Sequence, residues 1–358
     1  MANKFTIVLI AGAFLSGCRC DFIVFDAQTK REMFRSCGES GGWEWPFQVC
    51  GSNEFVLTVQ YREKGRSTVR QYDVAGEVRR SWDVPFDFTP YEENPVVVGG
   101  KMLVVKDEDE RWGNRPFLWQ TDLDTLKFSV VSLGDLADDG MKLVDAWPVK
   151  DHNVVLYRKQ IFRKDRGRYE DQCGAKLVLI DPNKKKVLSQ VALPSVNPVS
   201  REFRLSPAHD MLCVKSEEVV MFFAADLSKI DQLQVGEFPC VMSEITLRME
   251  WTGSVEVTFV DICNGNWFAY NVLTKKVVRQ GKIRLEKAAG NVGEEHIHGI
   301  LSRDLFFTSR DDKWCNIVET KVVQVNSDGS ETAIGKGGLL RSWHEPKLLT
   351  PEIFFDLE

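Results

Sequence analysis

The sequence predicts an all-β fold in which one four-stranded antiparallel unit is repeated along the chain. Seven segments share a pattern in which a strand-like apolar run ends at Asp or Asn, passes through a polar turn and resumes as a second strand-like run. Asp and Asn accept hydrogen bonds from backbone amides two positions on and tolerate the dihedrals of tight turns. Val, Ile, Phe and Tyr favour the pleated strands on either side. A second pair of apolar runs between successive hairpins brings each unit to four strands.

The hairpins recur at a nearly regular interval. Successive turn residues are separated by between 45 residues, from Asp181 to Asp226, and 59 residues, from Asp122 to Asp181. About 40–50 residues is typical of the repeat of a β-propeller blade, and the longer intervals then hold inserted loops. In chain order the predicted hairpins span residues 22–34 around Asp26, 69–82 around Asp73, 117–133 around Asp122, 177–193 around Asp181, 219–235 around Asp226, 267–283 around Asn271 and 322–334 around Asn326.

One of the intervening strand pairs carries a more specific turn. Phe203-Arg204-Leu205-Ser206-Pro207 precedes Met211-Leu212-Cys213-Val214, and this Ser-Pro turn resembles the inner-strand turn of WD-like and Tol-associated β-propellers. The repeats as a whole resemble the broad propeller superfamily, which includes quinoprotein-like members. The seven hairpins predict seven blades, with six or eight blades as the alternative counts. The resemblance implies that the blades form a disc with a central channel. It also implies that blade-to-blade loops share a face with the loops joining second to third strands.

The two ends of the chain are expected to complete one blade together. The first hairpin follows Cys18 with no room for two preceding strands, whereas the last hairpin is followed by Leu339–Trp343 and by Ile353–Phe355. Pairing of the N- and C-terminal strands would remove exposed sheet edges that promote aggregation. We therefore expect the C-terminus to close the first blade.

The N-terminus has the pattern of an export signal. Lys4 precedes an apolar run over residues 5–15, which is too short to span a membrane as a helix. The tetrad Leu15-Ser16-Gly17-Cys18 resembles the lipobox of bacterial lipoproteins, which implies a signal peptide over 1–17, a lipid-modified Cys18 and a single mature domain over 18–358. Arg19, in place of Asp, resembles sorting to the periplasmic face of the outer membrane. An ordinary signal peptide cut elsewhere is the alternative.

Composition restricts the classes of partner. The formal net charge is −6, so no global basic field favours nucleic acid. No later segment approaches twenty uninterrupted apolar residues, and no Pro- or Ser-rich linker divides the chain. We expect one folded body, with two domains as the alternative, that contacts the membrane through its lipid anchor alone.

Two long connections are the candidate interface with a protein or envelope partner. Residues 106–116 and 158–174 are rich in charge, and loops of this length are often functional. Trp, Tyr and Arg are the side chains that most often anchor interfaces. The alternative is that the charges are merely solvated and the aromatic rings cover sheet ends. The candidate interface residues are Trp43, Trp45, Tyr91, Arg111, Trp112, Arg163, Arg166, Arg168, Tyr169 and Trp314.

Chemical signatures are sparse. His296 and His298 lie two apart, so on a regular strand both imidazoles would face one side and could bind one metal ion. The alternative is that they line a water-filled channel. The sequence contains no Gly-x-Ser-x-Gly turn and no phosphate-binding glycine loop, and it predicts no cofactor. A non-enzymatic scaffold is therefore favoured over the alternative, an exported enzyme or small-ligand or sugar binder that uses the central channel.

Eight cysteines besides Cys18 leave the disulfides open. Export permits disulfide bonds, but eight cysteines allow 105 complete pairings. Cys240 and Cys263 flank the inner strands of one unit and are expected at the same end of it, as are Cys37 and Cys50. Cys213 lies inside an apolar run and is expected to be a buried thiol.

Overall fold

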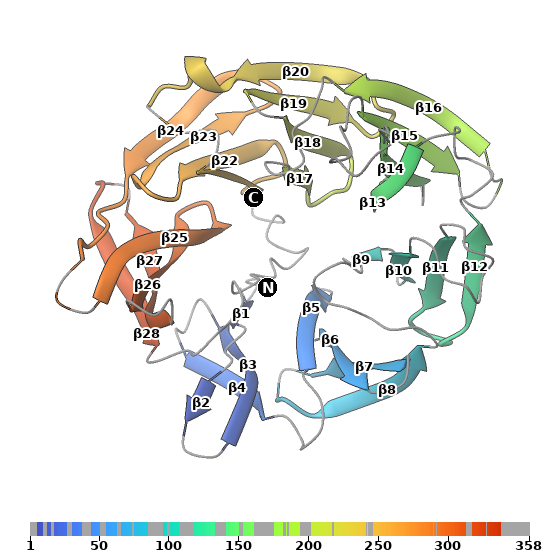
Figure 1. Cartoon of the computed structure of the whole chain (residues 1–358), viewed down its shortest axis with the longest axis horizontal. Coiled ribbons are helices and arrows are strands. Elements are labelled where there is room, and N and C mark those ends of the chain that lie inside the picture. Colours follow the sequence, from blue (N-terminus) through green and yellow to red (C-terminus); the bar gives the residue numbers. More distant parts are fainter. Residues whose placement is uncertain are drawn as a thin grey trace, which may run out of the picture. The chain divides into compact units, whose positions relative to one another are not determined.

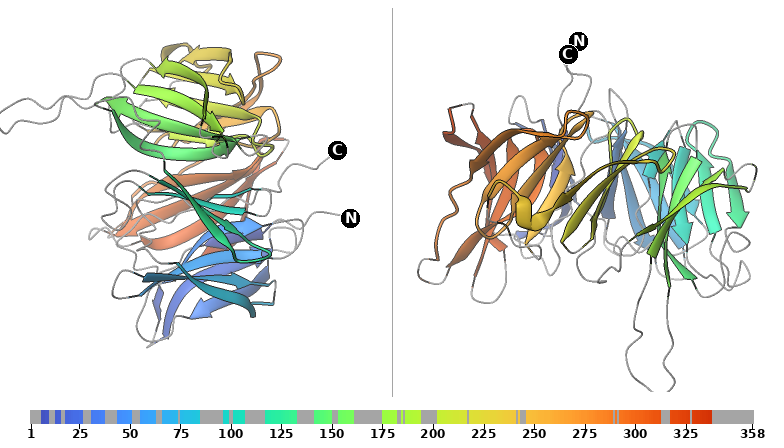
Figure 2. Two further views of the ribbon diagram at one scale, coloured as in Figure 1. Left: turned by 90° about the vertical axis from the view of Figure 1, so that its right-hand side faces the viewer. Right: turned by 90° about the horizontal axis from the view of Figure 1, so that it is seen from above.

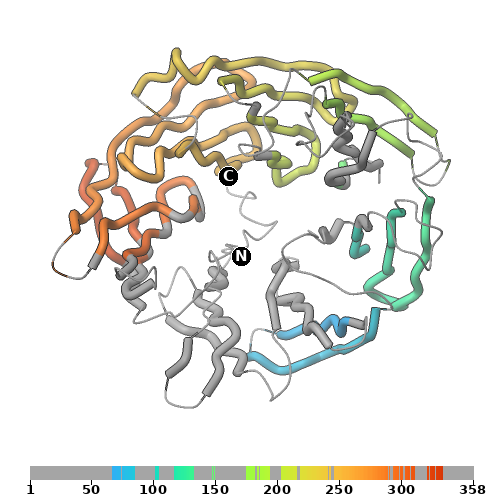
Figure 3. The backbone as a smooth tube through the Cα atoms, in the orientation of Figure 1, coloured from blue at the N-terminus to red at the C-terminus, as the bar shows by residue number. Residues whose placement is uncertain are grey.

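The computed structural model describes the backbone of the strands given below. It describes side chains within residues 67–84, 101–104, 117–132, 147–149, 175–193, 203–240, 242–300, 303–310 and 321–333, with short gaps in these ranges. Figure 3 colours these parts of the chain. Within them, no helix is long and apolar enough to cross a membrane.

The chain forms two compact units, residues 91–238 and residues 1–90 together with 239–358. The unit of residues 91–238 contains three four-stranded antiparallel sheets (Figure 1), and two further views show the strands of its second sheet side by side (Figure 2). Its strands are β9 (Val96–Val98), β10 (Lys101–Lys106), β11 (Phe117–Asp122) and β12 (Phe128–Ser132); β13 (Met141–Val149), β14 (Asn153–Gln160), β15 (Ala175–Asp181) and β16 (Lys186–Leu193); and β17 (Glu202–Leu205), β18 (Met211–Ser216), β19 (Val219–Ala224) and β20 (Lys229–Gln234).

The other unit contains four sheets, three of which have the same strand order. Their strands are β5 (Glu44–Cys50), β6 (Phe55–Arg62), β7 (Arg66–Tyr72) and β8 (Val78–Val84); β21 (Leu247–Trp251), β22 (Glu256–Asp261), β23 (Asn266–Asn271) and β24 (Lys276–Lys282); and β25 (Val292–Ser302), β26 (Leu305–Asp312), β27 (Ile317–Val325) and β28 (Glu331–Gly337). In each, strands pair with their neighbours in sequence. A short 3-10 helix, η4 (Val235–Glu237), follows β20 and belongs to the unit of residues 91–238.

The predicted hairpins are the third and fourth strands of these sheets, as the pairings β7–β8, β11–β12, β15–β16, β19–β20, β23–β24 and β27–β28 confirm. Their turn residues act as predicted. Asp122 Oδ1 accepts hydrogen bonds from the backbone amides of Asp124 and Thr125 over 3.1 and 2.8 Å. Asn271 Oδ1 binds the amides of residues 273 and 274 in the same way.

Burial explains why the hairpin pattern is visible in the sequence. The third strand is covered on both faces, as in β23, where four central residues are buried, and the fourth strand is largely exposed, as in β24. The Ser-Pro turn is also confirmed between β17 and β18. Ser206 is fully buried and accepts hydrogen bonds from the amides of Asp210 and Met211 over 3.1 and 2.9 Å. Cys213 is a buried thiol, as predicted.

Each unit has its own apolar core. In the unit of residues 91–238, one cluster joins β13–β16 to β17–β20, where Trp147 stacks on Phe203 with ring centroids 4.7 Å apart. In the other unit, a cluster joins β21–β24 to β25–β28 and includes Trp267 and Phe306, whose ring centroids are 5.6 Å apart. These two pairs of neighbouring sheets therefore pack face to face through apolar side chains.

The first sheet is built differently from the other six. The hairpin around Asp26 forms from β3 (Cys18–Asp26) and β4 (Arg31–Cys37), but the two additional strands, β1 (Thr6–Leu9) and β2 (Ala13–Leu15), both pair with β3. Closure by the C-terminus is thus not confirmed, because residues 6–15 complete this sheet, and residues 338–358 lie outside those described. Removal of residues 1–17 would leave β3 and β4 without these partners.

Candidate functional site

The predicted interface lies almost entirely outside the described part of the chain. Trp45 lies on β5, where only the backbone is described. The positions of the interface side chains are therefore not described, and the interface stays a prediction. The remaining interface residues outside the described ranges are Trp43, Tyr91, Arg111, Trp112, Arg163, Arg166, Arg168, Tyr169 and Trp314.

The two predicted metal ligands lie on β25. His296 is half-buried and opposes Ser309 of β26, but the strand register shifts between Ile297 and Gly299, so the regular alternation assumed for His296 and His298 is interrupted at His298. Among the described residues, no three His, Cys, Asp or Glu side chains gather closely enough to hold a metal ion. The His pair remains a prediction without a third ligand in that part of the chain.

Asp261 is the last residue of β22, just before the turn to β23. Its charge acts on both Cys240 and Cys263. Asp261 is fully buried and accepts hydrogen bonds from the amides of Cys263 and Asn264 over 2.9 and 3.0 Å. Burial, and then the charge of Asp261, raises the pKa of both thiols. Both cysteines are free thiols. Their common neighbour agrees with the prediction that they lie at the same end of this sheet.

A cavity of about 450 Å³ lies between the outer strands of β21–β24 and one end of β25–β28. Its walls come from β23 and β24, from the β25–β26 turn and from the β27–β28 turn. In an antiparallel sheet, the first-to-second and third-to-fourth turns lie at the same end, opposite the second-to-third turn. The cavity therefore lies at the end of β25–β28 opposite the end where β26 stops and β27 begins. Its lining residues are Trp267, Arg279, Gln280, Gly281, Lys282, Arg303, Asp304, Val325, Asn326 and Gly329.

Trp267 contributes an unusual polar group to this cavity. The side chain is 4% exposed, and its indole Nε1 is buried with no hydrogen-bond partner among the described residues. Most buried polar groups are paired, and an unpaired one costs about 1–3 kcal/mol. Gly281 lies directly opposite Trp267 in the β23–β24 pairing, and a Cβ there would lie 2.9 Å from Nε1. Glycine thus lets the edge of the indole ring lie directly against the backbone of β24.

Arg279 and Arg303 make the cavity wall cationic. Arg279 lies 5.9 Å from the Trp267 ring centroid, donates from Nη2 to Glu256 Oε1 over 2.5 Å and also binds Asp304. Arg303 Nε lies 3.3 Å from the same Glu256 oxygen. Glu256 is buried behind the wall with its side chain 8% exposed, so it holds both arginines in place and ties β21–β24 to the β25–β26 turn.

Sequence reasoning did not find this site, because its groups come together only through tertiary structure. Glu256 is separated by 23 residues from Arg279 and by 47 from Arg303. One local signal was incomplete. A glycine opposite a tryptophan would indicate close approach of the ring to the backbone, but regular counting from the Asn271 turn pairs Trp267 with Gln280, and only the register shift between Ala269 and Tyr270 brings it opposite Gly281.

The sequence matches no protein-family profile, and no curated protein resembles it in sequence. Solved structures share its fold. Hsv2 of Kluyveromyces lactis is 9% identical, with 90% of this chain and 95% of that chain covered and a TM-score of 0.50. KlHsv2 with loop 6CD replaced by a Gly-Ser linker gives the same identity and coverage with a TM-score of 0.51. Hsv2 is a β-propeller. The chain therefore has the all-β architecture of four-stranded antiparallel sheets that β-propellers share.

Proposed function

We propose that this chain is an exported, lipid-anchored, seven-bladed β-propeller that acts as a non-enzymatic scaffold and binds a protein or envelope component. The observation that carries the proposal is the repeated four-stranded antiparallel sheet. Each described sheet has a packed core strand and a connection at either end, and such scaffolds hold recognition residues on the connections. Segment 106–116 carries Arg111 and Trp112, and segment 158–174 carries several arginines and Tyr169. The two segments overlap the ends of β10 and β14 and continue into the connections that follow these strands.

The anchor has its own test. Expression in a bacterial host with an isotope-labelled fatty acid should give a labelled wild-type protein that fractionates with the outer membrane. Cys18→Ala should be unlabelled and released from the membrane fraction. Cleavage after residue 17 with no acyl group on Cys18, shown by mass spectrometry of the mature N-terminus, would contradict the anchor while leaving the interface proposal intact.

The interface is tested by placing a photo-crosslinking amino acid at single positions. Arg111 and Arg166 lie on the two proposed binding connections, and Lys276 lies on the exposed fourth strand β24 as a control. Crosslinks from 111 and 166, but not from 276, to one protein or envelope component would support the scaffold. Equal or no crosslinking from all three positions would contradict it.

A second function, the binding of a small molecule, is favoured by one specific observation. The cavity beside Trp267 has a cationic wall formed by Arg279, Lys282 and Arg303, and its volume lies within the range of small-molecule sites. Its walls belong to the outer strands and turns of two sheets, so this function requires no central channel.

A further inference from the structure

We propose that the outer edge of the β21–β24 sheet docks onto the surface of an anionic lipid bilayer through exposed apolar and basic side chains. These side chains, called the β24 strip below, are Leu273, Lys276, Val277, Val278, Lys282 and Arg284. The strip is a membrane contact additional to the lipid anchor. It depends neither on that anchor nor on the scaffold interface.

β24 is the outer strand of its sheet (Figure 1) and presents side chains rather than a free backbone edge. Among the described strands it pairs with β23 alone, and six of its seven residues are exposed. The pairing register shifts between Ala269 and Tyr270, which leaves Val278 as the extra residue of a β-bulge. Because bulges turn an edge away from strand addition, a partner at this edge meets the side chains of the strip.

The apolar part of the strip is concentrated at one end of β24. Leu273, in the turn before the strand, is 61% exposed, and Val277 and Val278 are 41% and 45% exposed. Three of the seven large apolar side chains that are exposed in the described part of the chain thus lie within six positions. Single exposed apolar side chains are ordinary, but a group of them marks an interaction surface.

The basic part of the strip has the sign opposite to that of the whole chain. Residues 262–285 contain five Lys or Arg and no Asp or Glu, whereas the formal net charge of the chain is −6. Arg279 is bound by Glu256 and Asp304. The other four basic side chains are exposed, and they are Lys275, Lys276, Lys282 and Arg284. A local cationic edge of this kind attracts an anionic surface even though the chain as a whole is anionic.

The residue types in the strip favour a bilayer over a protein partner. Protein interfaces are enriched in Trp and Tyr and depleted in Lys, whereas the strip combines two lysines with aliphatic side chains and contains no aromatic one. Aliphatic side chains enter the boundary between lipid headgroups and acyl chains, and the long stems of lysines keep their ammonium groups level with the phosphates. An acidic segment of a protein is the competing occupant.

Flotation of the full-length protein with vesicles tests the docking. Every protein compared carries Cys18→Ala, so no acyl chain contributes, and the apolar residues 5–15 add the same background to each. Vesicles of phosphatidylcholine containing one third phosphatidylglycerol are compared with vesicles of phosphatidylcholine alone. We expect binding to the anionic vesicles to exceed binding to the neutral ones by about tenfold or more, and to weaken at high salt.

A matched pair of charge reversals locates the contact. Lys276→Glu/Lys282→Glu should weaken binding to the anionic vesicles by about tenfold or more. The control Lys127→Glu/Lys229→Glu makes the same change in net charge at exposed lysines of two other sheets, and it should change binding by no more than about threefold. Equal losses from the two double variants, or equal binding of the unreversed protein to neutral and anionic vesicles, would overturn the proposal.

The apolar part of the strip is tested in the same assay. Leu273→Ser should weaken binding to the anionic vesicles several-fold, whereas Val78→Ser, at an exposed valine of β8, should not. An unchanged affinity in Leu273→Ser would contradict entry of the strip into the bilayer. Soluble poly-glutamate bound through Lys276 and Lys282, with no binding of vesicles, would assign an acidic protein segment and overturn the proposal.

Failure of the docking is distinguishable from failure of the scaffold. The scaffold is tested by crosslinks from segments 106–116 and 158–174 to one component. Crosslinks from position 276 to lipid differ from capture of that component, so Lys276 still serves as the control there. Loss of vesicle binding in the charge-reversed strip leaves the scaffold proposal unchanged.

Discussion

Glu295 is the buried charge whose removal most sharply tests the packing of β25–β28. It is 4% exposed and accepts hydrogen bonds from Thr308 Oγ1 over 2.5 Å and from the amide of Glu286 over 3.0 Å. Lys321 Nζ lies 3.7 Å from Glu295 Oε2 and also binds the side chain of Glu286. This carboxylate thus joins the first three strands of the sheet to the chain that enters it.

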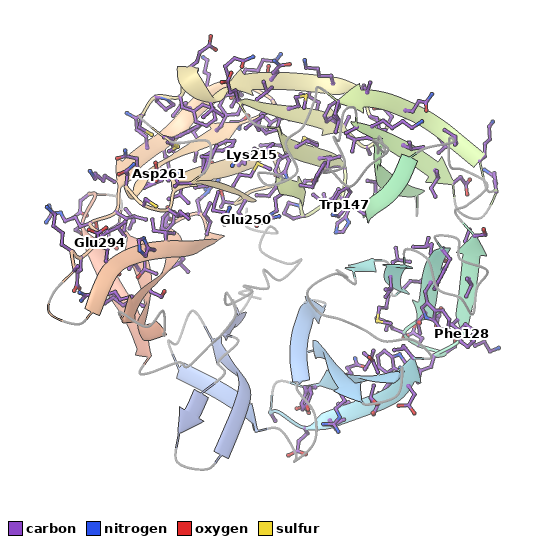
Figure 4. The ribbon with its side chains drawn as sticks, in the orientation of Figure 1. Phe128, Trp147, Lys215, Glu250, Asp261 and Glu294 are labelled. Carbon is purple, nitrogen blue, oxygen red and sulfur yellow. The ribbon has the colours of Figure 1, made fainter. Side chains whose placement is uncertain are left out.

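The cost of Glu295→Ala follows from these contacts. Two hydrogen bonds to a charged acceptor contribute about 1.5–3 kcal/mol each, and breaking a buried ion pair costs about 3–5 kcal/mol. Because Lys321 keeps Glu286 as a partner, we expect a total loss of about 3–5 kcal/mol. Glu294→Ala is the matched control, since Glu294 is the exposed neighbour on the same strand (Figure 4) and its loss should change stability by no more than about 0.5 kcal/mol.

Native-state hydrogen exchange of the amides in β25 and β26 measures this loss within the sheet concerned. Protection of these amides should fall in Glu295→Ala and hold in Glu294→Ala. Glu295→Gln, which keeps the shape and an acceptor for Thr308 but removes the charge, should fall between the two. A loss below about 1 kcal/mol in Glu295→Ala, or equal losses at both positions, would refute the ion-pair reasoning.

Three further predictions follow from the turns and the cysteines. Asp226 accepts hydrogen bonds from the hydroxyl and the backbone amide of Ser228, and these hold the pKa of its carboxyl below the ordinary 3.8. The stability that the ionised carboxylate contributes is therefore fully present above pH 3.8 and is lost as the pH falls through the lowered pKa. The difference in urea midpoint between wild type and Asp226→Asn should therefore vanish in strong acid, and a constant difference would contradict this. Burial and nearby carboxylates raise the pKa of the exposed Cys263 thiol above 9.0, so its alkylation rate should reach half-maximum above pH 9; a midpoint below 9 would exclude the shift. Cys20 and Cys37 are directly opposed in the β3–β4 pairing, where Cα atoms lie about 4.5–5.5 Å apart, within the disulfide range; non-reducing peptide mapping of the exported protein should link them, and free thiols at both would disprove the pairing.

Much of the repeat was predictable because its chemistry is local. Asp122 and Asn271 bind amides two or three residues away, so one short stretch of sequence determines the turn and its flanking strands. Ser206 binds amides four and five residues away and was found for the same reason.

The cavity and the first sheet were not predictable in this way. Glu256, Arg279 and Arg303 meet across two sheets, which no local pattern records. Trp267 Nε1 has no hydrogen-bond partner among the described residues, and this too depends on tertiary packing. In the first sheet, residues 6–15 pair with β3, although the charge and apolar pattern of residues 1–17 indicates a signal. The same apolar residues suit either an export signal or β-strands. From the sequence alone, the export signal was the favoured interpretation.

Crosslinking of the mature protein in native envelopes tests the scaffold most directly. Wild type is compared with a variant in which segments 106–116 and 158–174 are shortened to Gly-Ser turns, and with Trp267→Phe, which leaves both segments intact. The account predicts one specific partner captured by wild type and Trp267→Phe but lost from the shortened variant, with the variant still folded by hydrogen exchange of β21–β28. Capture of the same partner by the folded, shortened variant, or capture of no specific partner by wild type, would contradict the scaffold.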